Sequence, residues 1–295
     1  MSDVELINKI LLSKTYIDIF NINEYETDYK RFMKLIHPDV CHQENATKAV
    51  AILNNYKAQI ADVIVSIDDS GNFKYNPYKI LYSENKLLQD IAYINFKKLK
   101  HPTDSKAKNF QRYLPKDMLM HTTENNLRMC MLDKRAIPLT DLTLEQKHVN
   151  WVISRIMEFS CWLNFLGYSH CGITPETIFV VPETHGVIFT SLYHLTELNT
   201  KINTISAKYR TWYPDHVFTK KIATEDIDVC MIKRMSYYLL GDKSGNGTKL
   251  KMDKSMDKNY IDFMQELYTH PVQFYMKYRE FLSNTYKKEF HVLNL

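Results

Sequence analysis

Near the start of the chain, a short polar segment between two apolar patterns contains residues that could take part in chemistry or binding. They are His37, Pro38 and Asp39, which follow one another in the sequence. Proline fixes its own φ angle and restricts the residue before it to extended conformations. The imidazole and the carboxylate are therefore expected on a rigid turn that faces solvent. Such a tip suits contact with a partner protein.

A basic segment directly precedes this turn. Lys30, Arg31 and Lys34 lie close together in the sequence, and a positive field of this kind steers association with an acidic partner surface. We also considered metal binding by the histidine of the turn together with Cys41 and His42. Adjacent Cys and His residues space poorly for chelation and no second cluster is nearby, so we predict no metal here.

Two amphipathic helices must position the turn. Apolar residues recur at helical spacing over 24–36, and over 45–64 they follow an i, i+3, i+4, i+7, i+11 pattern. Pro38 ends the first of these helices, so we expect the two to pack antiparallel across the turn. Shorter helices are predicted over 4–12 and 16–20.

The polar run Asp-Asp-Ser-Gly-Asn at 68–72 is the first strong break in the pattern and predicts a domain boundary. The chain beyond it is expected to contain strands first and helices later, which predicts an α+β domain. The expected strands cover 91–99 and 127–132, with a hairpin of 178–181 and 186–189 around 182–185, and the expected helices cover 144–166, 226–240 and 260–286.

Composition narrows the class of protein. The 295 residues include 38 basic and 34 acidic side chains with a formal charge of +4, which gives no case for a dedicated nucleic-acid role. Five well-separated cysteines without a CxxC pair indicate a reducing compartment. No stretch has the length and apolar character of a signal peptide or a membrane span, so we expect a soluble cytoplasmic protein without membrane partners.

Three segments at 16–20, 28–40 and 49–56 closely resemble a J domain in order and spacing, over about sixty residues. In that family the His-Pro-Asp loop and the basic helix before it dock on a DnaK-type chaperone and stimulate its ATP hydrolysis. The resemblance implies the same role for the 37–39 turn, with the three basic residues as docking support. It departs from the family in the absence of a clear basic fourth helix after Ile64.

The segment 167–180, which contains His170, resembles the catalytic-loop region of the protein-kinase fold. Residues 212–214, Trp-Tyr-Pro, resemble the end of an activation segment, and Asp228 resembles the start of the large central helix. The resemblance covers 77–290 and implies a two-lobed domain. The pairing of the two resembles fusions among predicted phage and bacterial proteins and implies such a source as an expectation. The high content of Asn, Lys, Ile and Tyr is compatible with an AT-rich genome.

The positions at which a kinase holds its reactive groups carry other residues. Gly172 stands at the catalytic Asp position, Thr177 at the metal-binding Asn, and Thr190 or Ser191 at the metal-binding Asp. Phosphoryl transfer depends on those groups, so we expect no magnesium site and no catalysis. We interpret His170 as a buried histidine that braces its loop.

The nucleotide side lacks its usual groups as well. No glycine occurs between Gly71 and Gly167, which excludes a Gly-rich loop, and no glutamate between residues 84 and 124 is available to pair with a strand lysine. Lys98, on the strand expected over 91–99, is the candidate for that lysine. The carboxylates considered as replacements lie at positions that do not match: Glu176, Glu183 and Asp215.

The sequence thus predicts a J-domain-like helical domain at 1–66, a linker at 67–76 and an inactive kinase-like domain at 77–295. The predicted function is a co-chaperone that recruits a DnaK-type ATPase and binds an unknown client, with no cofactor. Two alternatives stay open. One is a divergent kinase or nucleotide-binding enzyme with an N-terminal docking domain, and the other is an interaction protein that has lost chaperone stimulation.

Overall fold

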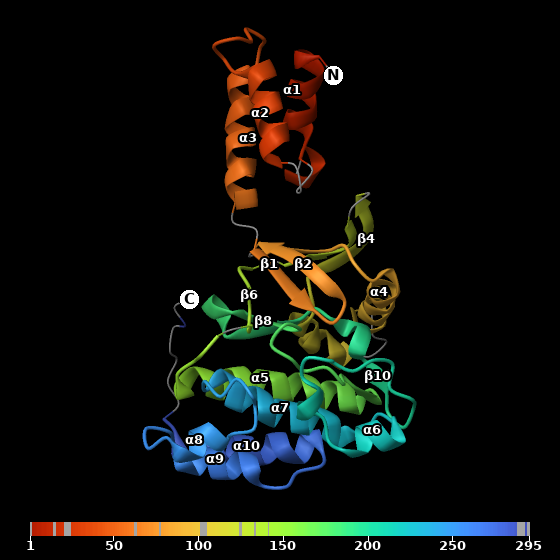
Figure 1. Ribbon diagram of the computed structural model, residues 1–295, viewed down its shortest axis with the longest axis vertical. Coiled ribbons are helices and arrows are strands. Elements are labelled where there is room, and N and C mark those ends of the chain that lie inside the picture. The colour runs from red at the N-terminus through yellow and green to blue at the C-terminus, as the bar shows by residue number, and fades with distance from the viewer. Residues whose placement is uncertain are drawn as a thin grey trace. The chain divides into compact units, whose positions relative to one another are not determined.

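The computed structural model divides into two units, and Figure 1 labels their elements. The first unit consists of residues 1–65 and 74–76, and the second of residues 66–73 and 77–295. The structure describes residues 2–13, 16–20, 25–61, 64–76, 78–100, 105–123, 126–132, 134–140, 142–287 and 293.

Helices build the first unit. The helix α1 (Asp3–Leu12) is followed by the 3-10 turn η1 (Tyr16–Asp18), α2 (Tyr25–Ile36) and α3 (Ala46–Ala61). The helices expected from the apolar periodicity are therefore confirmed, although residues 24, 62 and 63 lie outside the described part. Residue 64, expected in the last helix, belongs to a strand.

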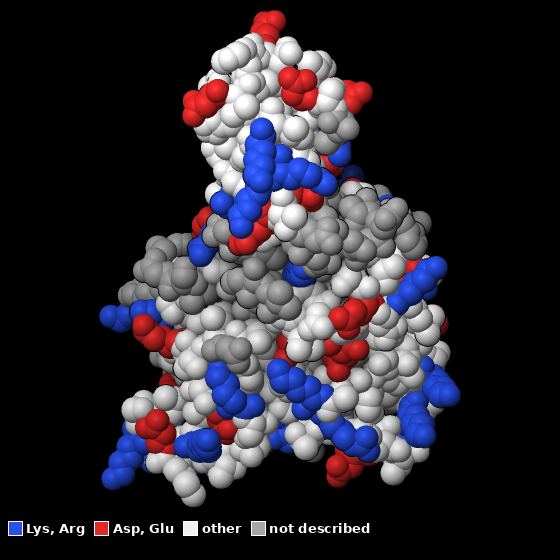
Figure 2. Space-filling model, turned by 45° about the horizontal axis from the view of Figure 1, so that its top comes forward, with Lys and Arg blue, Asp and Glu red and all other residues white. Residues whose placement is uncertain are grey.

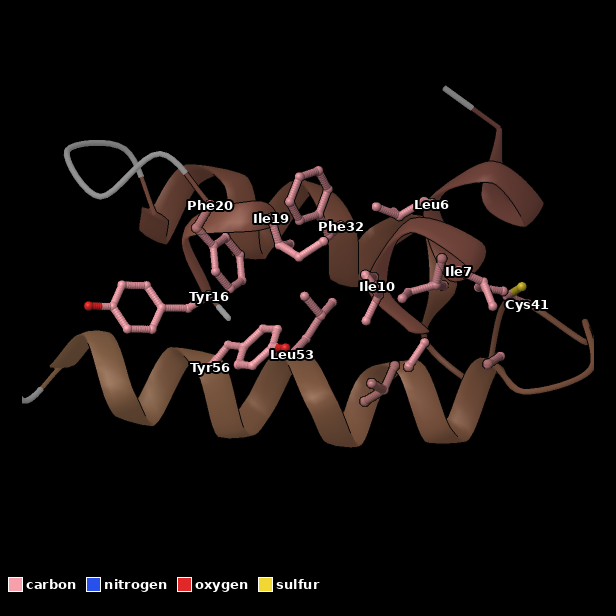
Figure 3. Packing of buried hydrophobic residues seen from close by; sticks show 14 residues of the cluster. Leu6, Ile7, Ile10, Tyr16, Ile19, Phe20, Phe32, Cys41, Leu53 and Tyr56 are labelled. Carbon is pink, nitrogen blue, oxygen red and sulfur yellow. The ribbon is translucent and has the colours of Figure 1, made fainter. Parts of the chain in front are cut away.

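The interior of this unit is filled by apolar side chains from all three helices (Figure 3). Leu6, Ile10 and Leu53 are completely buried, and the rings of Phe20 and Phe32 stack with their centroids 5.8 Å apart. Removal of this apolar surface from water is the main stabilising contribution in a unit of this size. It holds α2 and α3 side by side, so the loop between them emerges from one end of the pair.

A five-stranded sheet with the order β1-β2-β3-β5-β4 comes next. The pairs β3–β5 and β4–β5 are antiparallel, and the expected strand at 127–132 is confirmed as β5. The strands are β1 (Ile64–Asp68), β2 (Gly71–Asn76), β3 (Lys79–Tyr82), β4 (Asp117–Thr123) and β5 (Asn126–Met131).

The strand expected over 91–99 was wrong, because this segment lies in the helix α4 (Lys86–Lys100). The buried residues Gln89, Ala92, Phe96 and Leu99 recur at helical spacing. Residues 92, 96 and 99 already follow this spacing within the segment. The continuous apolar run at 91–94 hides it in the sequence, because such a run is also typical of a strand.

The linker expected at 67–76 was also wrong, because these residues belong to the β1–β2 hairpin. Phe73 and Tyr75 are buried, as alternation along a strand requires. Gly71 has a φ of +111°, a conformation that only glycine adopts without strain. The polar run at 68–72 therefore marks a tight turn within a sheet.

The rest of the chain is mainly helical. The long helix α5 (Gln146–Phe165) packs against α7 (Glu225–Leu239) and α10 (Pro271–Thr285), which confirms the expected helices at 144–166 and 226–240. The segment 260–286 is split, because Pro271 begins a new helix with His270 as its N-cap. The shorter helices are α6 (His216–Lys220), α8 (Thr248–Met252) and α9 (Lys258–Gln265).

The hairpin expected around 182–185 is confirmed. The strand β8 (Ile178–Val181) pairs antiparallel with β9 (Gly186–Phe189), and β6 (Ile137–Pro138) adds to β8. A second small sheet joins β7 (Tyr168–Ser169) and β10 (Thr196–Glu197). The 3-10 turns of this part are η2 (Ser105–Tyr113), η3 (Pro182–Thr184), η4 (Leu192–His194) and η5 (Arg210–Trp212).

Helix and sheet together make the second unit an α+β structure, as expected. Across the ranges that the structure describes, no helix combines the length and the apolar character needed to cross a membrane. The five cysteines are all free thiols.

Candidate functional site

The turn at His37, Pro38 and Asp39 joins α2 to α3 and has a defined geometry. The His37 amide still donates to the Met33 carbonyl at 3.0 Å, and its own carbonyl accepts two amide groups, three and four residues further on, at 2.9 Å and 2.8 Å. The ring Nδ1 accepts the Asp39 amide at 3.3 Å and faces the Asp39 carboxylate at 3.3 Å. The imidazole is thus oriented, yet the two side chains are 42% and 85% exposed.

The basic residues of α2 are exposed, but they are not equivalent. Arg31 forms an ion pair with Asp28 at 2.7 Å and lies over the Phe32 ring at 5.0 Å. Lys30 and Lys34 are separated by four residues and therefore share one face of the helix. Because the Asp28 carboxylate offsets the charge of Arg31, these two lysines contribute most of the positive field beside the turn.

The surface charge is mixed elsewhere. On the face drawn in Figure 2, Lys and Arg side chains are interspersed with Asp and Glu. Cys41, considered above as a metal ligand, is buried and donates weakly to Asp3 with a distance of 3.7 Å. In the described part of the chain, no group of three or more His, Cys, Asp or Glu residues is arranged to hold a metal ion.

In the second unit, Asp228 on α7 anchors the loop that carries His170. Its carboxylate accepts the amides of His170 and Cys171 at 2.9 Å and 3.0 Å, and the hydroxyls of Ser169 and Ser160 at 2.9 Å and 3.2 Å. Burial raises the pKa of Asp228, whereas these hydrogen bonds favour the charged form. Cys171 is held at a φ of 56°, so the four bonds stabilise a strained backbone.

His170 lies fully buried behind this anchor. Its ring is 5.2 Å from the Phe189 ring and 6.5 Å from that of His194, between centroids. Desolvation, reinforced by His194, lowers the pKa of His170 to about 3. The side chain is therefore neutral at physiological pH, and it packs in the interior.

Gly172, at the position expected for a catalytic Asp, has no room for a side chain. A Cβ atom built there would lie 2.2 Å from the His194 ring. The His194 side chain is itself completely buried, and its Nδ1 and Nε2 lie 3.3 Å from the Thr204 carbonyl and 3.2 Å from Asp69. An imidazole thus occupies the space that an acidic side chain at residue 172 would need.

Thr177 and Thr190, the other two substituted positions, act within the backbone network. The Thr177 hydroxyl contacts the carbonyls of Gly172 and Thr174 at 2.9 Å each, and it accepts the Thr174 amide at 3.1 Å. The Thr190 amide donates to the Thr177 carbonyl at 3.1 Å. Both residues are buried, and their hydrogen bonds join backbone groups of neighbouring loop segments to one another.

The tip of the β1–β2 hairpin lies against the same loops. Asp68 accepts the Ser191 hydroxyl at 2.8 Å. Asp69 accepts the hydroxyl of Ser206 and the amide of Ala207 at 3.0 Å each, in addition to its contact with His194. Burial opposes ionisation, yet these contacts, His194 foremost, outweigh it and lower the pKa of Asp69. The tip is therefore fastened to its own unit by two carboxylates.

Two basic residues bear on the strand lysine that was expected, Arg128 and Lys98. Arg128 on β5 is completely buried; it donates to Gln89 on α4 at 2.6 Å and to the Thr190 carbonyl at 2.9 Å, and it lies 3.9 Å from the Tyr82 ring centroid. It also contacts the Met118 sulfur at 3.6 Å. The expected candidate, Lys98, lies instead on α4 with an exposed side chain, because its segment is a helix and not a strand.

Glu176, considered above as a replacement carboxylate, is also engaged. It is 4% exposed, forms an ion pair with Lys208 and accepts the Tyr209 hydroxyl at 2.8 Å. It therefore connects the 170–177 loop to the segment that leads into η5. A carboxylate held in this way is a structural link.

Sequence reasoning missed Asp68, Asp69, His194 and Arg128. A single charge within the apolar strand around Arg128 is a signal that could have indicated a buried, paired group. The pair Asp69–His194 joins residues 125 positions apart, and no local pattern encodes such a contact. The two aspartates were interpreted as part of a polar boundary because a turn at the surface and a turn folded inward have the same composition.

No family model matches the chain, and no curated protein matches its sequence. Among solved structures, the chain is similar to vaccinia related kinase 3, with 12% identity, 75% of this chain and 90% of that chain covered, and a TM-score of 0.45. It is also similar to ROP2 from Toxoplasma gondii, a virulence factor with a protein-kinase fold and no enzymatic activity, with 12% identity, coverages of 75% and 77%, and a TM-score of 0.48. Both TM-scores lie below 0.5, so neither likeness carries weight for activity or partners.

The buried His170 predicts a specific loss of stability in acid. The pKa of His170 is about 3 in the folded chain against an ordinary value of 6.5, so below pH 6.5 the unfolded chain binds a proton that the folded chain does not. Stability should fall with pH by about 1.4 kcal/mol per unit in this window, or about 2 kcal/mol from pH 7 to pH 5. Urea unfolding at both pH values measures this loss, and the His170→Phe variant should lose about 2 kcal/mol less than the wild type. Equal losses in the two proteins would contradict the assignment.

The collision at residue 172 predicts a coupled effect of two substitutions. Gly172→Ala should destabilise the protein by about 1–3 kcal/mol, because the new methyl group must displace the His194 ring. In a His194→Gly background the same change should cost clearly less, since both the ring and the His194 Cβ, which would lie 2.7 Å from the new methyl group, are gone. Thermal and urea unfolding of the four proteins of this double-mutant cycle measure the coupling, and strictly additive losses would rule out the steric explanation.

Proposed function

We propose that the protein is a co-chaperone that recruits a DnaK-type ATPase through the turn at His37, Pro38 and Asp39 and stimulates its ATP hydrolysis. The observation that supports this most directly is the geometry of the turn. The turn lies at one end of a helical hairpin. The Asp39 amide orients the His37 imidazole, and the Asp39 carboxylate is exposed. Lys30 and Lys34 supply a positive face beside it that suits an acidic partner surface.

The second unit, in this proposal, is a kinase-like scaffold that binds a client or partner and transfers no phosphate. The elements of this unit support the proposal by their order. The five-stranded sheet and α4 come first, the long helix α5 follows, and the loop held by Asp228 comes after it. The groups that phosphoryl transfer needs are replaced by Gly172, Thr177 and Thr190. The space beside the loop is taken up by His194 and by the hairpin tip that carries Asp69.

The co-chaperone proposal predicts faster ATP hydrolysis by a partner chaperone. Full-length protein should accelerate single-turnover hydrolysis by a bacterial DnaK-type chaperone, and His37→Gln should abolish the acceleration because it removes the oriented imidazole. His42→Gln is the matched control, since His42 is an exposed histidine of the same connection, and it should leave the rate unchanged. The loss of stimulation should occur while the circular dichroism spectrum and the melting temperature of the variant stay those of the wild type.

The basic face offers a graded test of the same proposal. The Lys30→Ala/Lys34→Ala variant should weaken stimulation more than Arg31→Ala, whose charge is already offset by Asp28. Lys48→Ala, an exposed lysine on α3, serves as the control. Stimulation that is absent with every DnaK-type chaperone tried, or that persists in His37→Gln, would refute the co-chaperone function.

The kinase-like unit is predicted to be inactive as a phosphotransferase. Incubation with ATP labelled on the γ-phosphate, magnesium and either casein or the protein itself should give no incorporation above that of a heat-inactivated sample. The reason is the missing carboxylate at residue 172 and the internally bonded Thr177 and Thr190. Incorporation that disappears in Arg128→Ala but survives in Lys98→Ala would instead support the alternative of a divergent kinase.

A further inference from the structure

A basic cavity lies in the second unit, away from the loop around Gly172. Its volume is about 420 Å³, and its lining includes the five cationic side chains of Lys100, Arg112, Lys116, Lys134 and Arg155. Cavities that hold small molecules in proteins typically measure about 300–1,000 Å³. This cavity is therefore large enough for a small organic molecule and larger than a single inorganic anion requires.

A single carboxylate, that of Glu158, forms ion pairs with two of these cations. Glu158 on α5 accepts Arg112 at 2.8 Å through one oxygen, and Arg155 at 3.0 Å and the Tyr113 hydroxyl at 2.6 Å through the other. Arg155 Nε also donates to the His185 carbonyl at 3.2 Å. The two guanidinium groups are thus fixed in place, and each keeps further N–H donors, since an arginine carries five.

Two further lysines line the cavity. Lys116 and Lys134 are exposed, and no ion pair joins either of them to a residue within the described ranges. Lys100 donates to the Pro115 carbonyl at 3.0 Å. Arg112 and Arg155 share the single carboxylate of Glu158, so these two arginines and the two exposed lysines carry more positive charge than Glu158 offsets. A bound anion would relieve the repulsion between them.

The floor of the cavity is formed by buried apolar residues. Leu114, Val181, Val187 and Ile188 are among the lining residues, and each is at most 3% exposed. The accessible groups of the lining are therefore mainly the cationic side chains. A phosphate group carries about −1.5 to −2 charges at pH 7 and accepts paired hydrogen bonds from arginine, so more than one such group is needed to match the lining.

We propose that this cavity binds a small molecule that carries two or more phosphate groups. Arg112 and Arg155 hold one phosphate in a fixed geometry, and Lys116 and Lys134 at the rim hold another. The site is independent of the co-chaperone proposal, because it uses none of the residues of the 37–39 turn.

Calorimetric titration of the full chain tests the proposal, with pyrophosphate and fructose 1,6-bisphosphate as the probes and citrate as a carboxylate of similar charge. We expect saturable binding of at least one probe, clearly tighter than that of citrate. The Lys116→Ala/Lys134→Ala variant should bind about tenfold or more weakly. Lys249→Ala/Lys251→Ala, which removes two exposed lysines of α8, is the control of equal charge and should bind like the wild type.

A second arm distinguishes a free ligand from a lipid headgroup. Vesicles of phosphatidylcholine with and without phosphatidylinositol bisphosphate are sedimented with the protein. Binding to the phosphorylated vesicles that depends on Lys116 and Lys134 supports the site with a headgroup as its ligand, and binding to the soluble probes alone supports a free ligand. The proposal is overturned if neither occurs, if citrate binds equally well, or if the two double variants lose affinity equally.

Discussion

The buried carboxylate of Asp228 is the constraint on which the second unit depends. It collects four hydrogen bonds from α5 and from the 169–171 loop, so a helix and a loop far apart in the sequence share one charged centre. A buried charge is tolerated only when its hydrogen-bonding capacity is used. The bonds of Asp228 to the amides of His170 and Cys171 fix the backbone directly before Gly172.

The first unit has a simpler basis. Its three helices bury one continuous apolar cluster, and the turn at 37–39 is rigid because the helices on either side of it are packed. Binding residues that sit on such a support lose little freedom when a partner arrives. The same reasoning explains why the turn can be exposed and still well defined.

Many of the helices and strands could be predicted from local sequence patterns. Helical spacing identified α2 and α3, a long apolar segment identified α5, and two short apolar runs on either side of 182–185 identified the β8–β9 hairpin to the residue. The failures have two physical origins. The continuous apolar run at 91–94 is compatible with a strand as well as a helix, and the turn at 68–72 was taken for a boundary. The substituted positions at 172, 177 and 190 were visible in the sequence, whereas the contacts that fill their surroundings join residues more than a hundred positions apart and could not be read from it.

The packing of His194 against Gly172 also limits which residues position 172 accepts. An aspartate introduced there would meet an imidazole already held by Asp69 and the Thr204 carbonyl. A larger side chain at this position therefore disturbs three segments at once. Residue 194 and the hairpin tip would have to change together with residue 172, so we expect substitutions at these three places to be correlated.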